Sequence, residues 1–176
     1  MPDAAWEQIQ DDYEDFWGPF VARFDYPTGI TEPTPSVTVD LAPIFASEQA
    51  QFAAAADAVD ALALLAMTRV FAPAERLLVL DWQHPSWWFR PHVQAVRDRQ
   101  RHQSWWFPPH ERAVRDNQDW PVTVFPDGDY YAFLSEDMTA GTYGHPWEQT
   151  LCIFGKLAPV LVPMLTAWLP TKRSRQ

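Results

Sequence analysis

The chain has 176 residues, of which 47% are hydrophobic and 15% aromatic, so it carries enough apolar side chains to bury the core of one domain and is unlike a disordered chain. Its net charge of -10 at pH 7 disfavours binding to nucleic acid and to anionic lipid, and it favours a basic partner. The single cysteine excludes an internal disulfide, and the acidic amino terminus lacks the basic start and apolar run of a signal peptide, so we expect a cytoplasmic protein with no membrane span.

Three elements are predicted in the first half of the chain. Apolar residues recur at three- and four-residue steps from Trp6 onward and predict a first helix, which Gly18-Pro19 should end. After a proline-rich connector, residues 37–41 alternate between apolar and polar side chains, as a short strand does. A second helix with one apolar face is predicted between Ser47, which can cap its start, and Pro73, which should stop it.

The second half of the chain predicts a group of strands followed by a helix. Four short runs are predicted as strands: residues 77–82, 122–125, 130–134 and 150–154. The turn signal Pro126-Asp127-Gly128-Asp129 predicts a hairpin between the second and third of them. A closing helix over residues 157–168 needs Pro163 near its first turn, and the tail from residue 171 is expected to be frayed. We therefore expect an α+β fold, with a mainly antiparallel sheet of about four to five strands covered by N-terminal, middle and C-terminal helices.

Residues 84–119 contain the same segment twice. We expect the chain to form a single domain over residues 1–176, with this tandem duplication inside it. Shifting the sequence by 18 positions lays Ser86-Trp87-Trp88-Phe89 on Ser104-Trp105-Trp106-Phe107. Two short copies do not make a solenoid, which needs about three repeats or more. We therefore expect one Trp-Trp-Phe to pack on the sheet and the other to lie on its surface. The candidate binding residues in the two copies are Trp87, Trp88, Trp105 and Trp106.

The two copies also hold four histidines: His84, His92, His102 and His110. Spacings of eight residues or more put no two of them on adjacent turns of a helix, and no thiolates accompany them, so no metal site is predicted. Arginines between the tryptophan pairs could stack on single-stranded nucleic acid. The acidic residues of this segment and of the whole chain disfavour that function.

A second candidate site is a group of polar residues around the strands predicted after residue 129. The candidates for acid-base or metal chemistry are Asp129, Glu136, His145 and Glu148, and the candidates for binding are Asp127 and Asp137. There is also a purely structural interpretation. It assigns Asp127 and Asp129 to a hairpin turn. It also has His145 bonding a backbone carbonyl and Trp147 anchored in the core.

Four stretches resemble a known family: Asp81-Trp82-Gln83-His84-Pro85, Asp127-Gly128-Asp129-Tyr130-Tyr131, Ser135-Glu136-Asp137 and residues 144–150. The sequence is closely similar over residues 126–155 to the bacterial family known as domain of unknown function 2716. Residues 77–85 and, more weakly, the first predicted helix share the resemblance. The resemblance implies no activity. In the family pattern the His-Pro-aromatic segment occurs once, whereas this chain has it twice.

Two functional hypotheses follow from these features. The chain lacks a phosphate-binding loop, a dinucleotide-binding glycine motif, a Gly-x-Ser-x-Gly elbow and a His-Glu-x-x-His motif, and Cys152 lies in an apolar run, so no cofactor is predicted. The first hypothesis is a cytoplasmic, non-enzymatic binding domain whose acidic surface engages a basic protein, for example an immunity protein that neutralises a basic toxin. The second is a small metal-dependent or acid-base hydrolase that uses the polar residues between Asp127 and Glu148.

Deleting the second copy, residues 102–119, should leave the chain folded, because Arg101 then joins Trp120 and the first copy remains complete. The closure entropy of a loop grows only with the logarithm of its length, so halving a surface loop changes the free energy of unfolding by about 0.6 kcal/mol. Urea unfolding of the deletion variant measures this. A deletion variant that is unfolded in the absence of urea would mean that both copies are integral to the fold.

Overall fold

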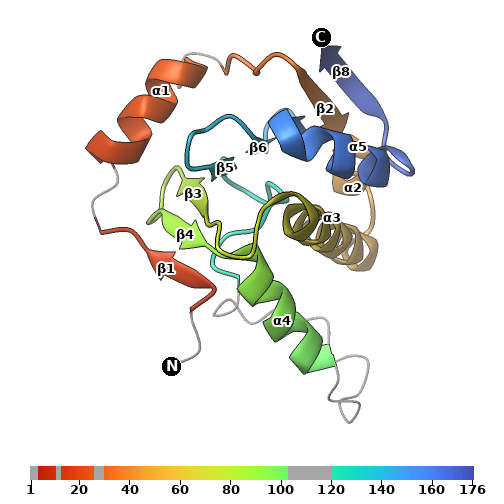
Figure 1. Cartoon of the computed structure of the whole chain (residues 1–176). Helices are drawn as coiled ribbons and strands as arrows, with labels where there is room; N and C mark the ends of the chain where they lie inside the picture. Colours follow the sequence, from red (N-terminus) through yellow and green to blue (C-terminus); the bar gives the residue numbers. More distant parts are fainter. Residues whose placement is uncertain (1–3, 11–12, 26–29, 103–119) are drawn as a thin grey trace.

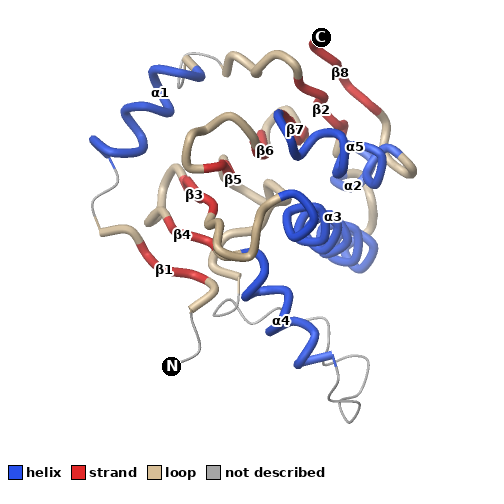
Figure 2. The backbone as a smooth tube through the Cα atoms, in the orientation of Figure 1, coloured by secondary structure: helices blue, strands red, loops and turns tan. Residues whose placement is uncertain are grey.

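The computed structural model describes residues 4–10, 13–25, 30–102 and 120–176, and within these ranges the chain forms one antiparallel sheet with helices on both faces (Figures 1 and 2). The sheet has eight strands in the order β1-β4-β3-β5-β6-β7-β2-β8. The strands are β1 (Trp6–Gln8), β2 (Ser36–Asp40), β3 (Leu77–Asp81), β4 (Trp87–Phe89), β5 (Tyr131–Ser135), β6 (Gly141–His145), β7 (Thr150–Phe154) and β8 (Thr171–Arg175). The helices are α1 (Gly18–Phe24), α2 (Ala42–Phe45), α3 (Gln49–Val70), α4 (Pro91–His102) and α5 (Ala158–Thr166), with a π-helical turn over Tyr13–Trp17 and a 3-10 turn over Gly155–Leu157. The predicted α+β fold with a mainly antiparallel sheet is confirmed, but the predicted number of strands, four to five, is too low.

The sheet separates two apolar clusters, and alternate residues of each central strand belong to different ones. In β3, Leu77 and Val79 pack in the cluster that contains α3 and α5, while Leu78 and Leu80 pack in the cluster that contains α1. Figure 1 looks roughly along the strands and shows α1 on one side of the sheet and α3 and α5 on the other. Cover on both faces explains why β3 and β7 are buried at every position.

Helix α3 is long and apolar enough to cross a bilayer by length and composition alone, the only such helix in the part of the chain that the structure describes. Here it is the central helix of the larger core, where Val59, Ala63 and Met67 are completely buried. A core helix passes the same test of length and composition.

The amino-terminal segment differs from the helix predicted there. Trp6 lies in β1 opposite Phe89 of β4, with the two rings stacked 4.2 Å apart, and its indole Nε1 donates to Gln94 Oε1 at 3.0 Å. Gly18-Pro19 begins α1 instead of ending a helix, because proline in a first turn lacks only an N–H that has no intrahelical partner. Contacts with distant residues therefore override the local helical periodicity of this segment.

Residues 122–125 were predicted as a strand and a hairpin arm, and both predictions are wrong. The segment is largely buried, but its backbone bonds to a side chain: the amides of Val124 and Phe125 donate to Asp60 Oδ1 of α3 at 2.8 and 2.9 Å. The place beside β5 is taken by β6, which includes two glycines. A Cβ at Gly144 would lie 2.9 Å from the Cβ of Pro126, so glycine lets the 122–130 segment pass close to β6.

The carboxyl-terminal segment was predicted to be frayed, but it forms the edge strand β8. Its anchor is Glu32, whose side chain is 5% exposed and accepts hydrogen bonds from Arg173 Nε at 2.8 Å, Arg175 Nε at 3.2 Å and Thr38 Oγ1 at 2.7 Å. Burial alone would raise the pKa of Glu32, but these hydrogen bonds and the charge of Arg173 outweigh it and lower the pKa overall. An ionised Glu32 therefore stabilises β8.

Two smaller predictions also fail. Ser47 does not cap α3; its hydroxyl donates to the carbonyl of Ile44 at 2.6 Å. Pro163 lies inside α5, not in its first turn.

Replacing Asp60 with alanine should lower the free energy of unfolding by roughly 2–5 kcal/mol, because two buried amides lose their acceptor and each costs about 1–3 kcal/mol. Asp57→Ala, one turn earlier on the same helix and only partly buried, is the matched control and should cost much less. Urea unfolding of both variants measures the difference. Equal losses would show that the bonds to residues 124 and 125 contribute little.

Glu32→Gln should lower the free energy of unfolding by roughly 1.5–3 kcal/mol at pH 7, the contribution typical of hydrogen bonds to a charged group. Because the pKa of Glu32 is lower in the folded state, its contribution is complete above the unfolded pKa of about 4.3 and is lost as the pH falls through the folded value. The difference between wild type and variant should therefore shrink below about pH 4. A difference that stays constant with pH would contradict this role for the ionised carboxylate.

Candidate functional site

One end of the sheet collects acidic and aromatic side chains. It is the end at which β3, β6 and β2 finish and β5, β7 and β8 begin, and we call it the polar end. The acidic residues and the histidines at or just beyond these strand ends are Asp40, Asp81, His84, Asp127, Asp129, His145 and Glu148. Three exposed tryptophans lie in the segments next to these strand ends. Trp82 directly follows β3, Trp147 lies between β6 and β7, and Trp168 lies shortly before β8.

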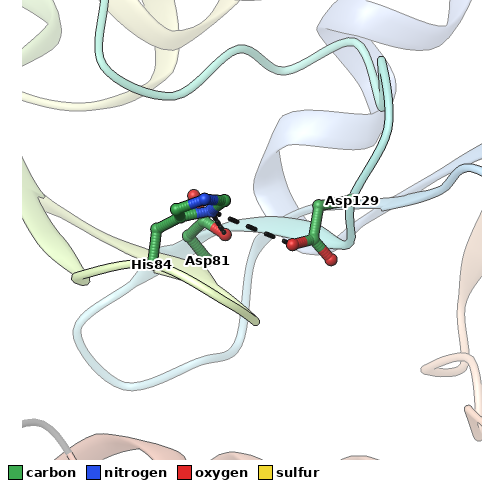
Figure 3. A group of neighbouring side chains, drawn as sticks. All are labelled: Asp81, His84 and Asp129. Atoms are coloured by element: carbon green, nitrogen blue, oxygen red, sulfur yellow. Dashed lines mark hydrogen bonds and ion pairs between the residues drawn. The ribbon is translucent and has the colours of Figure 1, made fainter.

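Asp81, His84 and Asp129 converge at the polar end (Figure 3). Asp81 is the last residue of β3 and pairs with Tyr131, the first residue of β5, so the strand pairing brings the loop after β3 next to the loop before β5. His84 Nδ1 lies 3.1 Å from Asp81 Oδ1 and 4.0 Å from Asp129 Oδ2, and one ligand atom of each residue lies within 4.8 Å of the others. The side chains of Asp81 and Asp129 are 5% and 10% exposed, while that of His84 is 65% exposed.

The electrostatics of this cluster favour a positive charge. Burial raises the pKa of Asp81 and the nearby charge of Asp129 adds to the rise, while the hydrogen bond with His84 opposes it. Burial also raises the pKa of Tyr131, and the charges of Asp127, Asp81 and Asp129 raise it further. The neutral phenol of Tyr131 donates to Asp127 Oδ1 at 3.0 Å. Two carboxylates of the cluster, Asp81 and Asp129, therefore lie near a third, Asp127. The imidazole of His84 and the two buried carboxylates of the cluster are the groups here that could hold a metal ion.

His145 and Glu148 belong to a different group at the same end. His145 Nδ1 accepts a hydrogen bond from the amide of Glu148 at 3.0 Å, so this ring nitrogen bonds a backbone amide and not the expected backbone carbonyl. The ring of His145 packs edge-on against Tyr130 at 4.8 Å, and burial lowers its pKa. Glu148 Oε2 accepts from Arg173 at 2.7 Å and so joins the ion pairs that hold β8. Both residues therefore have a structural part in the β6–β7 turn.

Glu136 and Asp137 lie at the opposite end of the sheet. They follow the last residue of β5, roughly 16 Å along the strand from Tyr131. Glu136 pairs with Arg76 Nε at 2.7 Å. Hydrogen bonds from Ser135 and Thr139 lower the pKa of Asp137 to about 2, as expected for a carboxylate that caps a turn. The structure therefore does not bring Asp129, Glu136, His145 and Glu148 together as one hydrolase site.

The tryptophans of the first repeat copy are part of the sheet. Trp87 and Trp88 are half-buried in β4; Trp87 packs edge-on against Trp6, and the guanidinium of Arg76 lies 3.7 Å above the Trp88 ring. One Trp-Trp-Phe was predicted to pack on the sheet, but that of the first copy forms strand β4 within the sheet. Trp105 and Trp106 lie outside the described residues. Trp147 was predicted to anchor in the core, but it is 77% exposed.

Sequence reasoning missed Asp81 and His84 as site residues. The signal was an aspartate at the end of the buried run Leu77–Leu80, because a carboxylate that continues such a run is carried to the edge of the core by the strand itself. Which residues would lie opposite it depended on the pairing of β3 with β5, which the sequence alone does not specify.

The comparisons with known proteins place the chain in a family. A family model described as "Protein of unknown function (DUF2716)" matches residues 2–102 and 99–158, and the break falls where the first repeat copy meets the second. The uncharacterized protein YxiI of Bacillus subtilis (strain 168) is 34% identical over 80 residues, which cover 46% of this chain and 39% of YxiI, so the match spans less than half of that relative. No solved structure matches. Because the two matched ranges cover most of the chain and include Asp81, His84 and Asp129, the chain belongs to the DUF2716 family.

Proposed function

We propose that the chain is a protein-binding domain that docks a basic partner on the polar end of its sheet. The observation that carries this proposal is the position of the exposed tryptophans. Among the described residues, the exposed large apolar side chains are Leu65, Trp82, Val96, Trp147 and Trp168, and all three tryptophans of this set belong to the polar end.

Trp147 is the best candidate for the main anchor. It is 77% exposed and lies in the β6–β7 turn, which a hydrogen bond from the Gln149 amide to the Pro146 carbonyl closes at 3.2 Å. Tryptophan is enriched among the residues that contribute most to protein interfaces, and it can bury up to about 250 Å² on binding. Holding such a side chain in water costs free energy that a partner surface would recover.

The charge of the polar end defines the partner. Its basic residues are already paired: Lys172 lies 3.7 Å from Asp40, and Arg173 bonds Glu32 and Glu148. The remaining acidic groups, together with the net charge of -10, favour a basic surface and a rate of association that falls with salt. From β3 to β8 the strand ends extend over roughly 24 Å, about the width of a standard interface. Neutralisation of a basic toxin is one version of this function.

Trp147→Ala should remove partner binding while changing the free energy of unfolding by no more than about 0.5 kcal/mol, because the side chain is exposed. Binding is measured by capture of proteins from a bacterial lysate on the immobilised full chain, and stability by urea unfolding. The proposal expects one basic protein that wild type retains at low salt, releases at high salt and loses in the variant.

The matched control is Leu65→Ala, which truncates another exposed apolar side chain near the end of α3, away from the polar end. It should retain the same protein as wild type. Capture that is unaffected by Trp147→Ala, or lost equally in Leu65→Ala, would refute docking at the polar end. A marked loss of stability in Trp147→Ala would instead restore its predicted place in the core.

A further inference from the structure

We infer that Asp81, His84 and Asp129 form a binding site for one divalent transition-metal ion of the zinc type, with one coordination position open to solvent. The site lies at the polar end, but the inference does not rest on partner docking, because a separate set of contacts supports it.

The distances fit a common coordination centre. Around a tetrahedral zinc ion with bonds of about 2.0–2.1 Å, neighbouring ligand atoms are roughly 3.4 Å apart. The separations from His84 Nδ1, 3.1 Å to Asp81 Oδ1 and 4.0 Å to Asp129 Oδ2, lie on either side of that value. Small changes of side-chain torsion would therefore bring the three ligand atoms to equal distances from one ion.

The burial of two carboxylates beside each other needs a counter-charge. Asp129 is nine-tenths buried, yet within the described residues its Oδ2 accepts no hydrogen bond, and its nearest cationic group is His84 Nδ1 at 4.0 Å. A single histidine, 65% exposed and charged only when protonated, neutralises one of the two carboxylates at most. A divalent ion between the three side chains would neutralise both carboxylates, and Figure 3 shows one oxygen of Asp129 directed toward His84 and Asp81.

The surrounding backbone already orients the ligands. The amide of Tyr130 donates to Asp129 Oδ1 at 2.7 Å, which leaves Oδ2 for the ion. The amide of Gln83 donates to Asp81 Oδ1 at 3.3 Å, and Asp81 itself ends a fully buried strand. Outer contacts of this kind fix ligand orientation in metal sites.

The donor set selects the type of ion. Calcium and magnesium prefer oxygen ligands alone, whereas an imidazole with carboxylates suits zinc and related transition ions. Three protein ligands leave a fourth position for water, which is the arrangement of zinc sites that remain open. The exposure of His84 places that position at the solvent side of the cluster.

Titration of the metal-free full chain with zinc by isothermal calorimetry tests the inference without any partner present. We expect one ion per chain, with affinity that falls as the pH is lowered, because protons compete with the ion for the ligand atoms. His84→Gln and Asp129→Asn should each weaken zinc binding by at least about 100-fold, since loss of an outer contact alone costs about 10–100-fold. Calcium and magnesium should bind far more weakly than zinc.

Two control variants separate a specific site from general acidity. Asp127→Asn removes the same charge from the same loop and should weaken zinc binding far less than Asp129→Asn does. His145→Gln removes another histidine at the polar end and should bind zinc as wild type does. Circular dichroism checks that every variant is folded, and His84 is exposed enough for its replacement to be tolerated. The inference is overturned if wild type does not saturate with zinc, if His84→Gln binds unchanged, or if Asp127→Asn weakens binding as much as Asp129→Asn.

Discussion

The pairing of β3 with β5 is the constraint on which the rest of the structure depends. It sets Leu77 opposite Ser135 and Asp81 opposite Tyr131, and it closes the chain between β3 and β5 into one long connection. That connection contains both repeat copies, and the first copy supplies β4 and most of α4. The cost of closing it rises only slowly with its length, so a duplication there is tolerated more easily than one inside the sheet. The family match breaks at the same place, between the two copies.

The elements that sequence patterns predict are those whose own side chains supply their burial. The apolar face of α3 and the buried runs of β3, β5 and β7 need no distant partner to be recognised. The strands that were missed depend on such partners. β1 needs the stacking of Trp6 on Phe89, and β8 needs Glu32 for its arginines. Residues 122–125 were instead predicted as a strand that the structure does not contain. The carboxylate of Asp60 accepts the hydrogen bonds from their amides that a neighbouring strand would otherwise accept.

The candidate site could be predicted from the sequence only in part. Asp129 was a candidate, and its position just before a strand was correct. Glu136 was grouped with it because both flank the same predicted strand, but the two ends of a five-residue strand are too far apart for joint chemistry. The true neighbours, Asp81 and His84, come from a strand that is distant in sequence. Trp147 was wrongly predicted to lie in the core, because tryptophan side chains are highly buried on average, whereas a turn at the end of a sheet can hold the ring in solvent.

Acidic groups, exposed tryptophans and a histidine with two buried carboxylates thus share one end of the sheet, and a bound ion there would stabilise the loops that meet at that end. The most direct measurement is a crystal structure of the full chain grown with zinc, with diffraction recorded on both sides of the zinc absorption edge. The account predicts one anomalous peak about 2.0–2.2 Å from ligand atoms of Asp81, His84 and Asp129. A structure in which zinc lies only at other residues, or in which Asp81 and Asp129 bond to protein groups with no ion between them, would contradict it.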